Sequence, residues 1–159
     1  MKISLIPMTD DMYYIYFKEY ENDPDLYLDK DKYKPYVYSI EGVSRYIERK
    51  KAKKQIPMAI ICDNEMIGEL IFKEIIPGES VTIGISLKQA KYKDHGYGTE
   101  AEKLAVDYAF KKLGVKTVLA DTILTNTRSQ HVLEKVGFVE TNRDDMFIYY
   151  ELQKNKFYA

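Results

Sequence analysis

The chain has 159 residues and a formal net charge of −1, with 45% hydrophobic and 31% charged residues, which is typical of one globular domain spanning residues 1–159. The near-neutral charge gives no general attraction to nucleic acid, and no apolar run approaches the roughly 20 residues that span a bilayer. The N-terminal residues lack the pattern of a secretory signal, so a cytoplasmic location is the default expectation.

The N-terminal third of the chain predicts one strand and two helices. Residues 2–7 alternate weakly and predict a strand, and residues 9–22 begin with capping side chains and predict a helix. Residues 23–39 are rich in Asp, Tyr and Pro, which is typical of an irregular connection. Apolar residues at helical spacing predict a second helix within residues 39–55.

The middle of the chain changes to strand patterns. Residues 58–63, 66–76 and 81–87 predict three strands joined by short turns, which should pair antiparallel. Residues 98–113 then carry a clear helical stripe of apolar side chains, and Gly114 is placed to end that helix in a left-handed conformation.

The C-terminal part predicts a strand over residues 116–123, a helix over 126–136 that stops at Gly137, and a final strand over 146–152. The predicted order is therefore β-α-α-β-β-β-α-β-α-β. This order indicates an α/β fold with a mixed, mostly antiparallel sheet flanked by helices.

Cysteine and histidine are too few to suggest a metal site. Cys62 is the single cysteine, and it is accompanied only by His95 and His131, so neither an internal disulfide nor a metal cluster is expected.

The most informative segment is residues 93–101, Lys-Asp-His-Gly-Tyr-Gly-Thr-Glu-Ala, between a predicted strand and the best-patterned helix. Gly96 and Gly98 lack a Cβ, so a ligand can approach the backbone closely, and the first amides of the helix point outward. Such a turn suits a pyrophosphate, with Lys93 or His95 adding positive charge. Alternatively, the two glycines only shape a tight loop. No P-loop lysine follows, and a three-glycine dinucleotide fingerprint is incomplete.

Two stretches resemble a known family. Lys93-x-x-Gly96-x-Gly98 resembles the Gln/Arg-x-x-Gly-x-Gly/Ala signature of GNAT acetyltransferases, and residues 96–101 are similar to the ribosomal-protein N-terminal (RimJ/RimL-like) branch. Residues 126–138, Asn-Thr-Arg-Ser-Gln-His-Val-Leu-Glu-Lys-Val-Gly-Phe, resemble the Asn-x-x-Ser-x-x-x-Leu-Glu-Lys-x-Gly-Phe motif of that branch. The resemblance covers residues 58–152 well, whereas the first two helices match only in their placement.

The resemblance implies acetyl-CoA as co-substrate, no metal, and direct attack by an amine on the bound thioester. The strand matching residues 81–87 would splay from its neighbour and hold the pantetheine arm, and the amides of residues 95–99 would hold the pyrophosphate. The cofactor-binding residues expected on this basis are Ile85, Ser86, Leu87, Lys93, Asp94, His95, Gly96, Tyr97, Gly98, Thr99, Asn126 and Ser129.

Two of these residues have competing interpretations. Asn126 either bonds the pantetheine or caps the following helix. Ser129 is either the proton donor to the cofactor sulfur, as the resembling serine is proposed to be, or a solvent-facing helix residue. Many GNAT enzymes use a tyrosine four residues before the helix-ending glycine as the acid, but here that position is Leu133. Tyr149 is therefore the candidate substitute, although either it or Tyr150 could be ordinary sheet packing.

The general base is the least defined group. Glu69 and Glu74 lie on predicted middle strands near the expected cleft, and Glu74 is taken as the candidate, although a charged residue on a strand is more often solvated. Nine tyrosines lie between Tyr13 and Tyr46 among many carboxylates. This composition suits a cationic amine through cation–π contacts and ion pairs, or else a tyrosine-rich loop that packs on the sheet.

The sequence thus favours an N-acetyltransferase that uses acetyl-CoA and a primary amine such as a protein N-terminus, a polyamine or another small amine. The alternative is an acyl-CoA-binding sensor or interaction module without turnover. A nucleic-acid-binding role through the basic run at residues 49–54 ranks last, and neither nucleic acid nor membrane is expected as a partner. A monomer or homodimer is expected.

Overall fold

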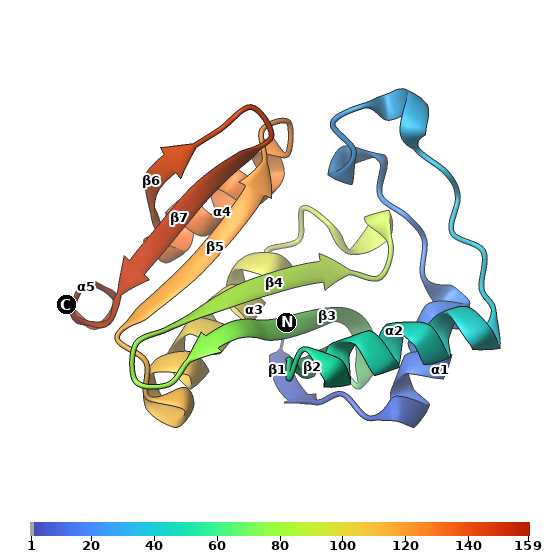
Figure 1. Cartoon of the computed structure of the whole chain (residues 1–159), viewed down its shortest axis with the longest axis horizontal. Coiled ribbons are helices and arrows are strands. Elements are labelled where there is room, and N and C mark those ends of the chain that lie inside the picture. Colours follow the sequence, from blue (N-terminus) through green and yellow to red (C-terminus); the bar gives the residue numbers. More distant parts are fainter. Residues whose placement is uncertain (1) are drawn as a thin grey trace.

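The computed structural model describes residues 2–159, and one seven-stranded sheet forms its centre (Figure 1). The strands lie in the order β1-β2-β3-β4-β5-β7-β6. Among the described residues only β4 and β5 pair in parallel, so the sheet is mixed and mostly antiparallel, as predicted. The strand bounds are β1 Ile3–Pro7, β2 Ile56–Cys62, β3 Glu65–Ile76, β4 Ser80–Leu87, β5 Thr117–Ile123, β6 Val139–Arg143 and β7 Phe147–Gln153.

Helices cover both faces of the sheet. Helices α1 and α2 pack together over β2 and β3, where aromatic side chains of both helices form one buried cluster. Helices α3 and α4 pack together on the other face, over the larger apolar cluster. The bounds are α1 Asp10–Glu19, α2 Ile40–Ala52, α3 Tyr97–Tyr108, α4 Thr127–Val136 and α5 Lys154–Phe157. None of the helices within residues 2–159 has the length and hydropathy needed to cross a membrane.

Local sequence signals set the helix ends. Thr9, Ser39 and Asn126 precede α1, α2 and α4, and each side chain accepts a hydrogen bond from the backbone N–H three residues later, at 3.0–3.3 Å. Gly114 and Gly137 follow the helices in the left-handed region, with φ of 69° and 117°. The capping and glycine signals in the sequence therefore act as predicted.

The parallel contact between β4 and β5 is short. The two strands pair only from Ser80 to Thr82 on β4 and from Thr117 to Leu119 on β5. Beyond this point they diverge, while β4 remains paired with β3 as far as Leu87. The sheet therefore opens in its middle, which is the splay that the family resemblance implied.

A long irregular segment, residues 20–39, connects α1 to α2. Figure 1 shows it as a blue-to-cyan arc that stands away from the sheet. It contains two short 3₁₀ turns, η1 Pro24–Leu26 and η2 Lys30–Lys32, and each turn begins with an aspartate cap. None of the side chains of residues 20–39 is fully buried. The sequence prediction of an irregular connection here is confirmed.

A few predicted bounds differ from those observed. The first helix ends at Glu19 rather than near Asn22, and the helix over 98–113 becomes a π-helical turn at Ala109–Leu113. Strand β6 was not predicted, because all five of its side chains are exposed and it carries no apolar alternation. It pairs with β7 as the outer edge of the sheet, where charged side chains such as Glu140 and Arg143 discourage pairing with another chain.

Helix α3 carries a buried glutamate. Glu102 in α3 is 1% exposed, and its Oε1 atom has no hydrogen-bond partner among the described residues. Burial raises the pKa of this carboxyl to about 8, so the group is protonated in the folded protein at neutral pH.

Candidate functional site

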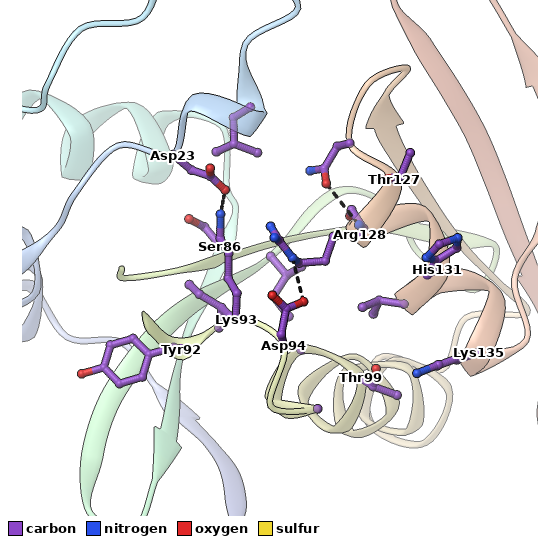
Figure 2. Close-up of a pocket in the computed structure, with 18 residues that line it drawn as sticks. Asp23, Ser86, Tyr92, Lys93, Asp94, Thr99, Thr127, Arg128, His131 and Lys135 are labelled. Carbon is purple, nitrogen blue, oxygen red and sulfur yellow. Dashed lines mark hydrogen bonds and ion pairs between the residues drawn. The ribbon is translucent and has the colours of Figure 1, made fainter. Parts of the chain in front are cut away.

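A cavity of about 570 Å³ occupies the opening between β4 and β5. The end of β4, the N-terminal ends of α3 and α4, and η1 of the 20–39 segment surround it (Figure 2). Its lining residues are Asp23, Leu26, Ile85, Ser86, Leu87, Tyr92, Lys93, Asp94, Gly96, Gly98, Thr99, Asn126, Thr127, Arg128, Ser129, His131, Val132 and Lys135.

The glycine turn forms the floor of this cavity at the start of α3. Gly96 caps the helix with φ +80°, a conformation that other residues adopt only with strain. Gly98 lies in the first turn, and a Cβ there would meet only Val132, at 3.9 Å. The protein itself therefore does not require glycine at 98, whereas a ligand lying against the helix N-terminus would. The first amides of a helix lack intrahelical partners and, with the helix dipole, favour an anion.

Two cations lie at the same turn. Lys93 forms a partly buried ion pair with Asp23, and Arg128 contacts Asp94 at 3.1 Å (Figure 2). Arg128 also contacts Asp25, at 3.2 Å. Burial and the nearby charge of Arg128 lower the pKa of Lys93. Phosphate groups are recognised by this combination of helix amides, lysine and arginine.

The wall opposite the glycine turn is formed by Ile85, Ser86 and Leu87 of β4 and by the first turn of α4. Asn126 lines the cavity, and its Oδ1 accepts a hydrogen bond from the Ser129 amide at 3.1 Å. The capping interpretation of Asn126 is thus observed, and its side-chain NH₂ is still able to donate to a ligand. Ser129 also lines the cavity.

Comparison with known proteins agrees with this geometry. Residues 2–139 match the acetyltransferase (GNAT) domain family. The chain belongs to the GNAT family. A Bacillus subtilis GNAT relative, the probable N-acetyltransferase YjcK, is 34% identical over 109 residues, which are 64% of this chain and 60% of the relative. The uncharacterised B. subtilis N-acetyltransferase YnaD is 25% identical over 103 residues, again 60% of its length. The matched region thus spans about three fifths of each curated relative.

Solved GNAT structures share the fold at low identity. An aminoglycoside acetyltransferase, AAC(6')-Ib, in complex with coenzyme A has a TM-score of 0.81 at 16% identity, over 99% of this chain and 98% of that one. A spermidine N-acetyltransferase from Vibrio cholerae, in complex with CoA and spermine, has a TM-score of 0.79 at 15% identity, over 99% and 98% of the two chains. These matches confirm the α/β GNAT fold.

Ten of the twelve cofactor-binding residues expected from the GNAT motifs line the cavity. The exceptions are His95 and Tyr97. The His95 ring lies 3.1 Å from the Lys91 carbonyl through Nε2 and stacks on Tyr97, with 5.3 Å between ring centroids. Their side chains are therefore outside the cavity, although both residues belong to the turn whose backbone forms its floor.

Two of the three expected catalytic residues lie away from the cavity. Tyr149 on β7 donates a hydrogen bond to Asp144 at 2.8 Å at the exposed surface. Glu74 has φ +52° at an irregularity of β3. Its carboxylate accepts a long hydrogen bond, of 3.4 Å, from the Thr82 hydroxyl. Thr82 is in the closed part of the β4–β5 pair, at the opposite end from Ser86. Of the three expected catalytic residues, the structure brings only Ser129 to the cavity.

The family tyrosine position is occupied by a core residue. Leu133 is 4% exposed and packs in the larger apolar cluster. His131, by contrast, lines the cavity, although no specific role was predicted for it.

A buried glutamate, Glu69, is the feature of the site whose surroundings the sequence did not predict, although it was one of the two candidate bases. Glu69 on β3 is 5% exposed and accepts hydrogen bonds from the hydroxyls of Tyr13 on α1 and Tyr46 on α2, the latter at 2.5 Å. Burial raises the pKa of Glu69, while the two hydrogen bonds and the charge of Lys50 partly offset the increase. The expectation that a strand glutamate here is solvated is wrong for Glu69.

This glutamate is connected to the cavity through its neighbour on β4. Glu69 is the direct cross-strand partner of Ser86, which lines the cavity. Ser86 also lies beside the hydroxyls of Tyr16 and Tyr20, whose pKa values are raised mainly by burial and lowered in part by the serine. A polar, tyrosine-rich layer therefore lies directly behind the β4 wall, on the side of the sheet that faces α1 and α2.

Proposed function

We propose that this protein transfers an acetyl group from acetyl-CoA to a primary amine. The single observation that carries the proposal is the cavity at the β4–β5 opening, where a glycine turn at a helix N-terminus and two cations meet an unpaired strand edge. Gly96, Gly98 and Thr99 with Lys93 and Arg128 would hold the phosphates, and Ile85, Ser86, Leu87 and Asn126 would hold the pantetheine arm. When bound, acetyl-CoA supplies an activated acetyl thioester.

The residues around the β4 wall support a division of roles in this reaction. Glu69 has a raised pKa, and it lies next to Ser86 behind the wall, so it is suited to take up the proton that an ammonium acceptor must lose. Ser129 lies on the other side of the cavity, where its hydroxyl would donate a proton to the leaving sulfur. We therefore place Glu69, rather than Glu74, on the acceptor side.

The acceptor is proposed to enter from the side of α1 and α2. This side presents Tyr13, Tyr16, Tyr20 and Tyr46 around the Glu69 carboxylate, which suits a primary ammonium through hydrogen bonds and cation–π contacts. A protein N-terminus, a polyamine or another small amine carries this group, and the GNAT structures named for aminoglycoside and spermidine acetylation support the same chemical class. Membership of the ribosomal-protein N-terminal branch is part of this proposal.

A thermal-shift titration with acetyl-CoA, CoA and longer acyl-CoAs tests the cofactor site, because a ligand that binds only the native state raises its apparent stability. We expect a saturable shift with acetyl-CoA. A thiol-release assay with spermidine, kanamycin and a short peptide with a free N-terminus then tests transfer. In that assay Ser129→Ala should lower the turnover number with little change in CoA affinity. No thermal shift at millimolar acetyl-CoA would contradict the proposal.

The buried Leu133 favours a second candidate, a protein that binds acyl-CoA without turnover, because the usual family acid is absent. A saturable shift with no thiol release across a wide amine panel would support this candidate over catalysis. We further propose one domain over residues 1–159 and a cytoplasmic location. We also propose a monomer or homodimer, and light scattering of the purified protein tests this oligomeric state.

A further inference from the structure

The two cations of the glycine turn already have acidic partners in the chain. The Lys93–Asp23 pair is the more buried one, with side chains 12% and 18% exposed. Arg128 contacts Asp94 (Figure 2) and also Asp25. A phosphate group arriving at this turn would therefore meet three carboxylates together with the two cations.

Two of these carboxylates come from the 20–39 segment rather than from the turn itself. Asp23 caps η1, with Oδ1 accepting from the Asp25 amide at 2.9 Å, and its other oxygen faces Lys93. Asp23 and Leu26 also line the cavity. This part of the segment thus lies across the opening of the proposed phosphate site.

Around η1 the segment is held by polar contacts, whereas Tyr20, Tyr36 and Tyr38 nearer its two ends pack against the aromatic cluster of α1 and α2. Its side chains are at most partly buried, and its bonds include Asn22 to the Lys34 carbonyl and Lys30 to the Pro24 carbonyl, both within the segment itself. Segments with few buried apolar contacts open at low free-energy cost. The ion pairs to Lys93 and Arg128 are therefore the main attachment of η1 to the cofactor cavity.

On the basis of the cofactor site proposed above, we infer that residues 20–39 act as an acidic latch that competes with the CoA phosphates for Lys93 and Arg128. In the free protein Asp23 forms an ion pair with Lys93, and Asp25 forms one with Arg128. When CoA binds, its phosphates form ion pairs with Lys93 and Arg128, and repulsion between the phosphates and the carboxylates displaces the two aspartates. Asp94 belongs to the turn itself and stays in place.

Latch opening would also change the acceptor side. The same segment carries Tyr36, whose ring packs against Phe17 and Tyr20 at centroid distances of 5.5 and 5.2 Å. These rings lie beside Ser86 and the Glu69 cluster. Displacement of η1 by the cofactor would therefore loosen the wall of the acceptor site.

Calorimetric titration of CoA into the wild type, Asp23→Asn and Asp29→Asn tests the latch. Asp29 is a matched control, because it caps η2 through the Asp31 amide at 3.0 Å and forms no ion pair among the described residues. Asparagine keeps the cap in both variants. A latch that is closed about nine-tenths of the time lowers the affinity about tenfold, so Asp23→Asn should bind CoA up to about tenfold more tightly, whereas Asp29→Asn should match the wild type.

A double-mutant cycle identifies the partner. In a Lys93→Gln background the gain from Asp23→Asn should shrink markedly, since the cation that it releases is gone. Hydrogen–deuterium exchange of residues 20–39 should increase when CoA saturates the wild type, and should already be high in Asp23→Asn/Asp25→Asn without CoA.

The opposite results overturn the inference. If Asp23→Asn binds CoA no more tightly than the wild type, the ion pair builds the site instead of blocking it. If CoA protects residues 20–39 from exchange, the segment closes over the cofactor as a lid. If the wild type, Asp23→Asn and Asp23→Asn/Asp25→Asn all fail to bind CoA, the proposed cofactor site is refuted, and the latch with it.

Discussion

Replacing Glu102 by glutamine should remove a pH-dependent loss of stability. Glu102 is fully buried in α3, and its Oε1 atom lacks a hydrogen-bond partner among the described residues. Its pKa is raised by burial from 4.5 to about 8, so the folded protein keeps the proton while the unfolded chain releases it. The unfolded state is therefore favoured progressively as pH rises from about 4.5 to 8, and the loss is complete above the folded pKa.

The magnitude follows from the pKa difference. Each pKa unit corresponds to about 1.4 kcal/mol, so the wild type should lose about 3 kcal/mol between pH 4.5 and pH 7 from this residue. Glutamine is neutral at every pH and nearly the same shape. The stability gained by Glu102→Gln should thus be near zero at pH 4 and grow to about 3 kcal/mol at pH 7.

Urea unfolding of both proteins at several pH values between 4 and 8 measures this difference. Glu100→Gln is the matched control, because Glu100 lies two residues earlier in the same helix, exposed and 3.9 Å from Lys103. The control should show no comparable pH-dependent gain. A constant difference between Glu102→Gln and the wild type across this range would refute the argument that a buried, unpaired acid destabilises the fold.

Three further predictions concern the cavity. Gly98→Val should weaken CoA binding by about tenfold or more with little change in melting temperature, since a Cβ at this position meets only Val132 within the protein. Gly96→Val should also destabilise the fold, because Gly96 has a φ of +80°. Asn126→Ala should cost about 1 kcal/mol of stability, because it removes the helix cap. Asn126→Ser keeps a capping oxygen, so it should weaken CoA binding without that loss of stability if the Asn126 amide binds the cofactor. Calorimetry measures the CoA affinity and thermal melting measures the stability, so together they distinguish the two roles. Glu69→Gln should leave CoA affinity unchanged and lower kcat/KM with loss of its acidic limb in the pH profile; an unchanged profile would remove Glu69 from proton transfer.

Most of the fold follows from the sequence because its elements have a buried face. The helical stripe of α3, the strands around Leu70 and Val118, and the caps at Thr9 and Asn126 all carry local signals that the structure confirms. Strand β6 has no such signal, since its pairing with β7 depends on backbone hydrogen bonds at an exposed edge.

The candidate site divides in the same way. The glycine turn and the Asn126 motif are each one continuous stretch of sequence, so ten of the residues that line the cavity could be predicted. Glu69 depends on Tyr13 and Tyr46, which are 56 and 23 residues away and reach it only after α1 and α2 pack on the sheet. The Asp23–Lys93 pair also joins distant residues through an irregular segment, and no periodic pattern predicts such a contact.

The short pairing of β4 with β5 means that the sheet has an edge in its interior. Past Thr82, the side of β4 that would face β5 pairs with no other strand among residues 2–159. The amide groups of a pantetheine arm could form hydrogen bonds with this edge as a neighbouring strand would. The arm would then join the β1–β4 part of the sheet to the β5–β7–β6 part. The bound molecule would then be a structural member of the fold as well as a reactant, and it would extend a backbone pairing that joins the two parts of the sheet over three residue pairs.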